Sequence, residues 1–221
     1  MENIQNFIEQ TNLRPTLIDK EIDHLVEQGK RYNFAGICVP PFWVKKARRE
    51  IGTTDLRLVT VIGFPLGYQM TESKINEMEM AIANGADELD MVINVSAFKS
   101  GMPWVKVEIA KCARLAHENG RLIKVIIETA YLSNDEMVDA AKICQDAGAD
   151  YVKTSTGFAP SGAKVEDIKL LRDKLSPQIA IKASGGIKTL EQASRLIAAG
   201  ADRIGTSSGV EIMQELVGKM T

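Results

Sequence analysis

Short apolar runs alternate along the chain with longer stretches in which apolar residues recur at helical spacing. Eight of these runs have the length and residue types of β-strands. They lie at residues 8–13, 34–39, 56–62, 88–94, 122–128, 151–155, 179–184 and 203–207, with helices between them and a last helix after Ser208. Such alternation is typical of parallel βα units. Eight units predict an α/β fold, a closed (β/α)8 TIM barrel, and a single domain over residues 1–221, because no linker or composition shift interrupts the series.

A repeated tripeptide, Gly-Ala-Asp, links three of the predicted helices to the strands that follow them. It begins at Gly85, Gly148 and Gly200, and five residues after these glycines stand Asp90, Lys153 and Gly205. A recurrent turn explains the tripeptides taken alone. The residues that follow place an acid, an amine and a glycine at equal depth in three strands. This arrangement is typical of a barrel whose active site is built from several strands at their carboxyl ends.

Two lysines, Lys153 and Lys182, lie in the middle of apolar strand runs. A buried ammonium is costly unless it has a partner or a purpose. Strand alternation directs both lysines and Asp90 into the barrel, together with Lys124 and Glu128 of the fifth strand. These residues could form a buried polar network that only holds the barrel together. Two cations beside one acid are, however, a poor structural arrangement and a good catalytic one.

The neighbouring cations suggest that one lysine amine attacks a carbonyl group of a substrate. Because a free lysine has a pKa of ~10.4, only about one in 2,500 is neutral at pH 7. A second ammonium ~6 Å away lowers that pKa by about two units. Lys182 can therefore activate Lys153 to attack a carbonyl, and the protonated imine that results assists making or breaking the adjacent carbon–carbon bond. Asp90, with Lys182 or a held water, can move the protons.

Small and hydroxylated residues follow the last two predicted strands. Gly185 and Gly186 come after the seventh, and Gly205, Ser207 and Ser208 end or follow the eighth. Backbone N–H groups at helix starts after these strands are the usual phosphate site of barrel enzymes. Either cluster alone could be a plain turn. Together they favour a phosphate-bearing ligand.

Composition excludes several other functions. The 27 Lys and Arg against 29 Asp and Glu give a net charge of −2, which offers no general attraction for nucleic acid or a membrane. The three cysteines show no C-x-x-C spacing, so a reducing cytoplasm fits better than a disulfide framework. Residues 1–5 show no export signal, and no segment reaches membrane-spanning length.

Metal and nucleotide sites are not predicted either. The two histidines, His24 and His117, fall in predicted helices outside the barrel and far from any strand end, so a zinc site lacks its ligands. No dinucleotide fingerprint or P-loop is present. We therefore expect no metal and no cofactor.

The motifs around these residues resemble those of the deoxyribose-phosphate aldolase family. They are K-T-S-T-G at Lys153, K-A-S-G-G at Lys182 and E-L-D-M-V at Asp90, and the likeness extends over residues 11–209. The resemblance implies a metal-free, Schiff-base aldolase that reversibly cleaves 2-deoxy-D-ribose 5-phosphate to D-glyceraldehyde 3-phosphate and acetaldehyde. It also implies a cytoplasmic enzyme of deoxynucleoside breakdown that tends to form homodimers.

The resemblance assigns roles to matching positions. It implies that Lys153 forms the imine, that Lys182 lowers its pKa, and that Asp90 relays protons. Residues implied to bind the substrate or its phosphate are Thr11, Thr154, Gly185, Gly186, Gly205, Ser207 and Ser208. Secondary candidates are Glu9, Lys124 and Cys38, a reactive or simply buried thiol at the end of the second strand.

The first strand departs from the family. Where the family commonly reads D-H-T-x-L-K-P, this chain has Glu9 and Gln10 before Thr11. The change is either drift or a reshaped pocket, and we expect Glu9 to remain a charge partner of Lys182 with Gln10 as a hydrogen-bonding neighbour. Two other functions stay open: a lysine-dependent aldolase for another phosphorylated sugar, and a phosphate-binding barrel without lyase activity, such as an isomerase. Borohydride reduction with acetaldehyde separates an aldolase from the latter.

Overall fold

Eight parallel strands close into a barrel in the order of the sequence. The computed structural model describes residues 3–218, so Met1 and Glu2 of the N-terminal segment considered above lie outside the described residues. Neighbouring strands pair all the way round, and β1 closes the ring against β8. The strands are β1 (Ile8–Thr11), β2 (Gly36–Val39), β3 (Arg57–Ile62), β4 (Glu88–Val92), β5 (Leu122–Ile126), β6 (Tyr151–Lys153), β7 (Ala180–Ser184) and β8 (Arg203–Thr206). The predicted TIM barrel is confirmed.

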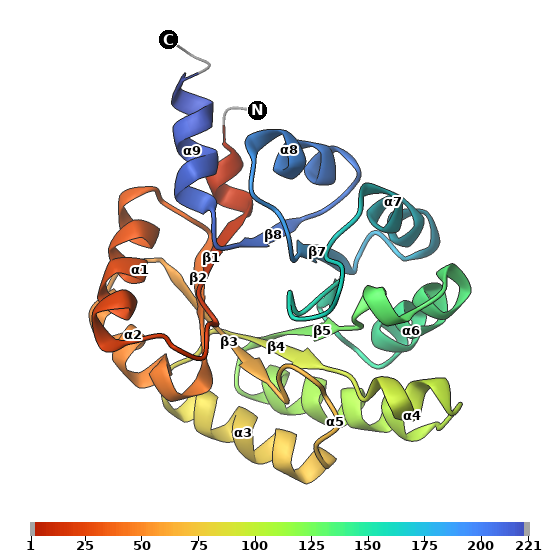
Figure 1. Cartoon of the computed structure of the whole chain (residues 1–221). Helices are drawn as coiled ribbons and strands as arrows, with labels where there is room; N and C mark the ends of the chain where they lie inside the picture. Colours follow the sequence, from red (N-terminus) through yellow and green to blue (C-terminus); the bar gives the residue numbers. More distant parts are fainter. Residues whose placement is uncertain (1–2, 219–221) are drawn as a thin grey trace.

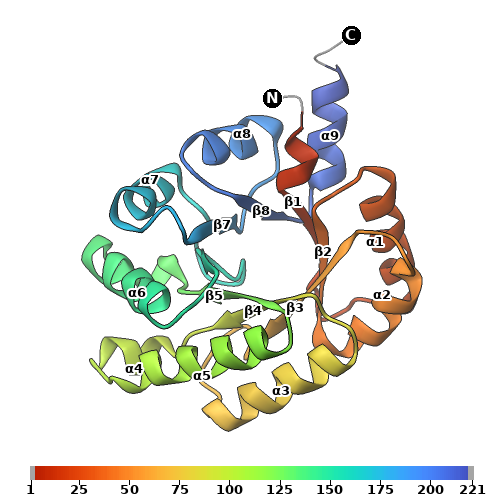
Figure 2. The same cartoon turned by 180° about the vertical axis from the view of Figure 1, so that it is seen from behind.

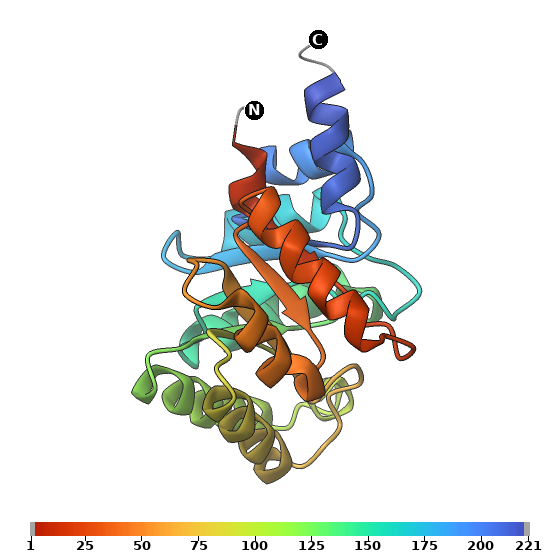
Figure 3. The same cartoon turned by 90° about the vertical axis from the view of Figure 1, so that its left-hand side faces the viewer.

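A ring of helices surrounds the barrel (Figure 1). They are α1 (Asp19–Arg31), α2 (Val44–Ile51), α3 (Thr71–Ala83), α4 (Val95–Lys99), α5 (Trp104–Glu118), α6 (Asn134–Asp146), α7 (Val165–Lys174), α8 (Leu190–Ala198) and α9 (Gly209–Gly218), with the 3-10 helices η1 (Ile4–Phe7), η2 (Pro41–Trp43) and η3 (Thr129–Tyr131). Helix α1 runs along the barrel wall and contacts β1 and β2 (Figure 3). Helices η1 and α9 lie side by side, as the view from behind shows (Figure 2).

The helix boundaries follow the signals in the sequence. Ser133 accepts from the N–H of Glu136, and the Glu136 carboxylate accepts from the N–H of Ser133, so the two residues form a capping box. The helix-ending glycines have positive φ, for example 98° at Gly85 and 111° at Gly200. Residues other than glycine rarely adopt this backbone conformation, which explains why these helices end at these positions.

Most strands end one or two residues before their predicted ends. The fourth strand ends at Val92 rather than at 94, and the sixth at Lys153 rather than at 155. In each case the apolar or motif pattern continues into a loop that still bonds to the neighbouring strand: the N–H of Thr154 donates to the carbonyl of Lys182 at 3.0 Å. The chain thus leaves the sheet two residues after Asp90 and directly after Lys153, at the carboxyl end of the barrel where barrel enzymes carry their sites.

Candidate active site

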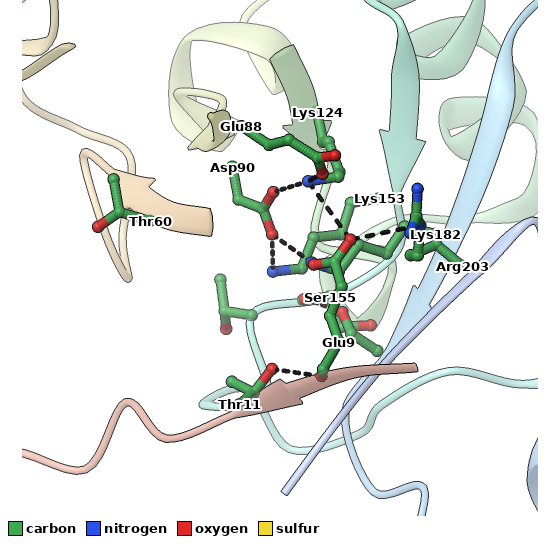
Figure 4. Close-up of polar contacts among 12 residues, drawn as sticks. Glu9, Thr11, Thr60, Glu88, Asp90, Lys124, Lys153, Ser155, Lys182 and Arg203 are labelled. Carbon is green, nitrogen blue, oxygen red and sulfur yellow. Dashed lines mark hydrogen bonds and ion pairs between the residues drawn. The ribbon is translucent and has the colours of Figure 1, made fainter. Parts of the chain in front are cut away.

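Asp90 lies at the centre of the barrel, where three lysines donate to its carboxylate (Figure 4). Lys153 Nζ and Lys182 Nζ both reach Oδ2, at 2.8 and 2.6 Å, and Lys124 Nζ reaches Oδ1 at 3.0 Å. Pairing in the barrel produces this arrangement, because Lys153 is the direct partner of Lys182 and Asp90 that of Lys124. All four side chains are buried. The structure therefore brings the predicted set of Asp90, Lys153 and Lys182 together.

Glu9 supplies a second acid to this cluster. Its carboxylate forms a short ion pair with Lys182 and lies 3.5 Å from both Lys124 Nζ and Arg203 Nε. Gly205, the strand partner of Glu9, leaves room for the amine, since a Cβ there would come within 3.1 Å of Lys182 Cε. The glutamate that replaces the usual aspartate thus contacts three cations at once.

Two members of the cluster were missed in the sequence: Glu88, which pairs with Lys124 at 2.6 Å, and Arg203. Both stand two residues before a recognised inward position, Asp90 or Gly205, so strand alternation could have identified them. Their inclusion corrects the expected two cations beside one acid. The cluster holds Lys124, Lys153, Lys182 and Arg203 against Glu9, Glu88 and Asp90.

The cluster separates the lysines by their pKa values. Burial lowers the pKa of Lys153, Asp90 opposes this effect, and the nearby Lys182 charge lowers the pKa further, so that it lies below its ordinary value. Burial also lowers the pKa of Lys182, but Asp90 and Glu9 outweigh burial and raise it. Burial raises the pKa of Asp90, yet the three lysines hold it well below its usual range. Lys153 is thus the lysine of the cluster that loses its proton most readily. The neighbouring Lys182 and Asp90 keep their charges.

Removing the charge of Glu9 should destabilise the fold. Glu9→Gln leaves three buried lysines and the partly buried Arg203 with two acids, and a broken buried pair costs about 3–5 kcal/mol. The Lys charges hold the pKa of Glu9 below its ordinary value against the effect of burial, so its stabilisation is present above the unfolded-state pKa and disappears as pH falls through the folded-state pKa. Urea unfolding at pH 7 should show the loss, and turnover should slow. Glu9→Asp is the matched control; equal stability of parent and Glu9→Gln at pH 7 would contradict the assignment.

A cavity of about 600 Å³ opens beside the cluster. Lys153 lines it, whereas Lys124 and Lys182 do not. The predicted ligand-binding residues that line it are Thr11, Gly185, Gly186, Gly205 and Ser207. They lie on β1 and at the carboxyl ends of β7 and β8, so a ligand extending from Lys153 toward these loops would meet their backbone groups.

Three predicted residues belong neither to the cavity lining nor to the charged cluster around Asp90. Thr154 is fully buried and its hydroxyl bonds to the backbone of Ser184, so it ties β6 to β7 rather than contacting a ligand. Ser208 lies next to the lining, immediately before α9. Cys38 is fully buried, and burial raises the pKa of its thiol to about 11, which agrees with the inert alternative rather than a reactive thiol.

Gln10 is a hydrogen-bonding residue, as expected, whereas His24 differs from its predicted place. Gln10 lines the cavity, accepts from the N–H of Gly209 at 2.8 Å and donates to Gln28 and to the Ser207 carbonyl. It therefore braces the loop between β8 and α9. His24, expected far from any strand end, lies at the outer rim of the cavity, and its ring bonds to Gln28. The error arose because α1 passes close to the open mouth.

Among residues 3–218, no group of three or more His, Cys, Asp or Glu side chains is arranged to hold a metal ion. Over the same residues, no helix combines the length and apolar character needed to cross a membrane.

The chain is similar to known aldolases over almost its whole length. The family model described as DeoC/LacD family aldolase matches residues 3–215. A deoxyribose-phosphate aldolase of Thermococcus kodakarensis is 48% identical over 214 residues, covering 96% of each chain. One of Clostridium botulinum is 48% identical over 212 residues, covering 96% of this chain and 99% of that protein.

Solved structures agree. An aldolase designated QR15 is 41% identical with a TM-score of 0.94, covering 100% of this chain and 98% of that one. A tetrameric deoxyribose phosphate aldolase from Aeropyrum pernix is 30% identical with a TM-score of 0.90, covering 99% and 92%. The barrel, the buried lysines and these likenesses together show that the chain belongs to the DeoC/LacD family of aldolases.

Proposed function

We propose that the protein is a Schiff-base aldolase that reversibly cleaves 2-deoxy-D-ribose 5-phosphate to D-glyceraldehyde 3-phosphate and acetaldehyde. The observation that carries this function is the position of Lys153. Of the three lysines around Asp90, it is the one that lines the cavity and has a lowered pKa. Relatives at 45–48% identity that bear the name deoxyribose-phosphate aldolase support the substrate.

The reaction begins with attack of the neutral Lys153 amine on C1 of the open-chain sugar. Loss of water gives a protonated imine. The C2–C3 bond then breaks, its electron pair moving into the imine to form an enamine, while the proton of the C3 hydroxyl leaves toward Asp90 by way of Lys182 or water. Protonation of the enamine at C2 and addition of water release acetaldehyde and restore Lys153. Lys182, with its raised pKa, is suited to donate protons in these steps.

The loops after β7 and β8 are proposed to hold the phosphate. Gly186, Gly205 and Ser207 all line the cavity. Nothing lies within 4 Å of a Cβ built on Gly186, which leaves its face free for a ligand. A phosphate seated here would place the other end of the sugar toward Lys153.

A carboxylate introduced in this loop should repel a phosphate. Ser207→Asp is expected to raise KM for deoxyribose 5-phosphate at least ~10-fold, with a much smaller effect on unphosphorylated deoxyribose, because the added charge opposes the anion that the helix start attracts. Steady-state kinetics on both substrates measure the difference. Ser207→Asn, similar in size but neutral, is the control. Equal losses on both substrates would mean that the loop only shapes the barrel.

Incubation with deoxyribose 5-phosphate, followed by assay of the released acetaldehyde, tests the substrate directly. If another phosphorylated sugar is cleaved much faster, the alternative aldolase gains support. An isomerase or a simple binder would release no acetaldehyde and would form no borohydride-stable adduct.

The remaining expectations are proposals as well. We infer a cytoplasmic enzyme whose barrel is one domain and which pairs as a homodimer. Sedimentation equilibrium tests the pairing. The Aeropyrum pernix relative is tetrameric, so a tetramer is the outcome that would replace the dimer.

A further inference from the structure

A second, smaller cavity lies beside the mouth of the barrel. Its volume is about 60 Å³, and it is mostly apolar. Its lining comes from the loops after β3, β4, β5 and β6: Pro65, Leu66, Val92, Val95, Glu128, Tyr131, Thr156, Phe158 and Ala159. Thr156 and Phe158 also line the main cavity. These two residues therefore form a wall between the two spaces.

Glu128 holds this wall from behind. Its carboxylate lies 3.2 Å from the N–H of Thr156 and makes a short hydrogen bond with the Thr156 hydroxyl. The Thr156 hydroxyl in turn accepts from the N–H of Phe158 at 3.0 Å. Glu128 is buried, so a carboxylate without these donors would be costly. A continuous chain of hydrogen bonds thus runs from Glu128, just after β5, to the backbone N–H of Phe158.

The backbone of Glu128 is held in an unfavourable conformation. Its φ of 55° and ψ of 70° lie in the left-handed region, which costs a residue with a Cβ roughly 1–3 kcal/mol. Such strain persists only where surrounding contacts fix it, and it gathers at functional sites. The conformation orients the carboxylate toward Thr156.

Phe64 supports the wall from the other side. Its ring meets that of Phe158 edge to face, with centroids 5.3 Å apart. The Phe158 ring is otherwise open, with 54% of the residue exposed. It is therefore held by one aromatic contact and by the hydrogen bonds that Glu128 anchors, and a substitution there should not disturb the core.

A substrate whose phosphate is held at β7 and β8 would point its carbonyl end toward the small cavity. The proposed phosphate loops follow β7 and β8, Lys153 ends β6, and the small cavity spans the loops of β3 to β6. A sugar phosphate anchored at β7 and β8 reaches Lys153 with the carbon that becomes the imine. A larger group on the donor carbons would extend past Lys153 toward the wall.

We propose that the Thr156–Phe158 wall, positioned by Glu128, restricts the aldehyde donor to acetaldehyde by closing off an apolar side pocket. This inference rests on the proposed aldolase function and adds its specificity for the donor. Behind the wall, Leu66, Val92 and Val95 offer an apolar surface suited to an alkyl group of one or two carbons. Glu128 acts through Thr156 as a positioning residue.

Opening the wall should admit larger donors. Phe158→Ala is expected to raise the ratio of kcat/KM for propanal over acetaldehyde, with glyceraldehyde 3-phosphate as acceptor, about 10-fold or more, the discrimination that one methylene group commonly gives. Tyr131→Ala is the matched control, because Tyr131 lines the small cavity but not the shared wall. Its ratio should stay that of the parent. An unchanged ratio in Phe158→Ala would overturn the proposal.

The role of Glu128 has its own test. Glu128→Ala should shift the donor ratio in the same direction as Phe158→Ala, whereas Glu128→Gln, which keeps an oxygen to accept from the Thr156 N–H, should stay near the parent. If the donor ratio shifted in Phe158→Ala but not in Glu128→Ala, the wall would still restrict the donor, but the positioning role of Glu128 would be overturned. The parent serves as the reference for function: failure to condense acetaldehyde with glyceraldehyde 3-phosphate would refute the proposed aldolase itself, whatever the variants do.

Discussion

Lys153→Ala is expected to lower kcat/KM at least about 10³-fold in both cleavage and condensation, because both directions pass through the same imine. Lys182 and Lys124 are poor substitutes as nucleophiles, since acids hold them and they do not line the cavity. Assays of acetaldehyde release and of its consumption with glyceraldehyde 3-phosphate measure the two directions.

Two variants make this result specific. Lys153→Arg keeps a positive charge beside Asp90 but provides no amine for an imine, so it should be as inactive as the alanine variant. Lys169→Ala, which removes an exposed lysine of α7, should match the parent. If Lys153→Arg kept a substantial part of the activity, Lys153 would contribute only its charge.

Lys182→Met should move the activity profile to higher pH and reduce the maximal rate. Lys182 lowers the pKa of Lys153, so removing this cation raises that pKa toward, or above, its ordinary value. Since the neutral amine is the nucleophile, activity then begins to rise only at higher pH than in the parent. The maximal rate falls because a proton donor is lost as well.

Lys182→Arg is the control for charge. It keeps the cation between Asp90 and Glu9, so its pH dependence should stay near that of the parent even if the geometry lowers its rate. The pH dependence of kcat/KM reports the free enzyme and is the profile to compare. Coincident profiles for Lys182→Met and the parent would show that the two lysines do not communicate.

Strand alternation was sufficient to predict the inward-facing residues of the site. Lys153 and Lys182 could be placed inside the barrel, facing Asp90, because alternate residues of a strand share a face and apolar neighbours marked the other one. Strand ends were less certain, since K-T-S-T-G continues the β6 pattern into a loop that bonds to β7. Local sequence does not show where the sheet hydrogen bonding stops.

Other features depend on tertiary contacts that the sequence does not display. Closure of the barrel sets Glu9 beside Gly205, and the length of the Glu9 side chain then decides that it contacts Lys124 and Arg203 as well as Lys182. Which lysine opens to the cavity depends on packing around all three. The Thr156–Phe158 wall likewise depends on contacts with Glu128 and Phe64, which lie in other loops of the chain.

Whether Lys153 forms the imine can be measured directly by reductive trapping with borohydride in the presence of acetaldehyde, followed by mass spectrometry of the digested protein. An imine reduced at the reacting lysine becomes a stable ethyl adduct. We expect one adduct, on Lys153, that is absent from Lys153→Ala. An adduct on Lys182 or Lys124, or no adduct in a protein that still cleaves deoxyribose 5-phosphate, would contradict it.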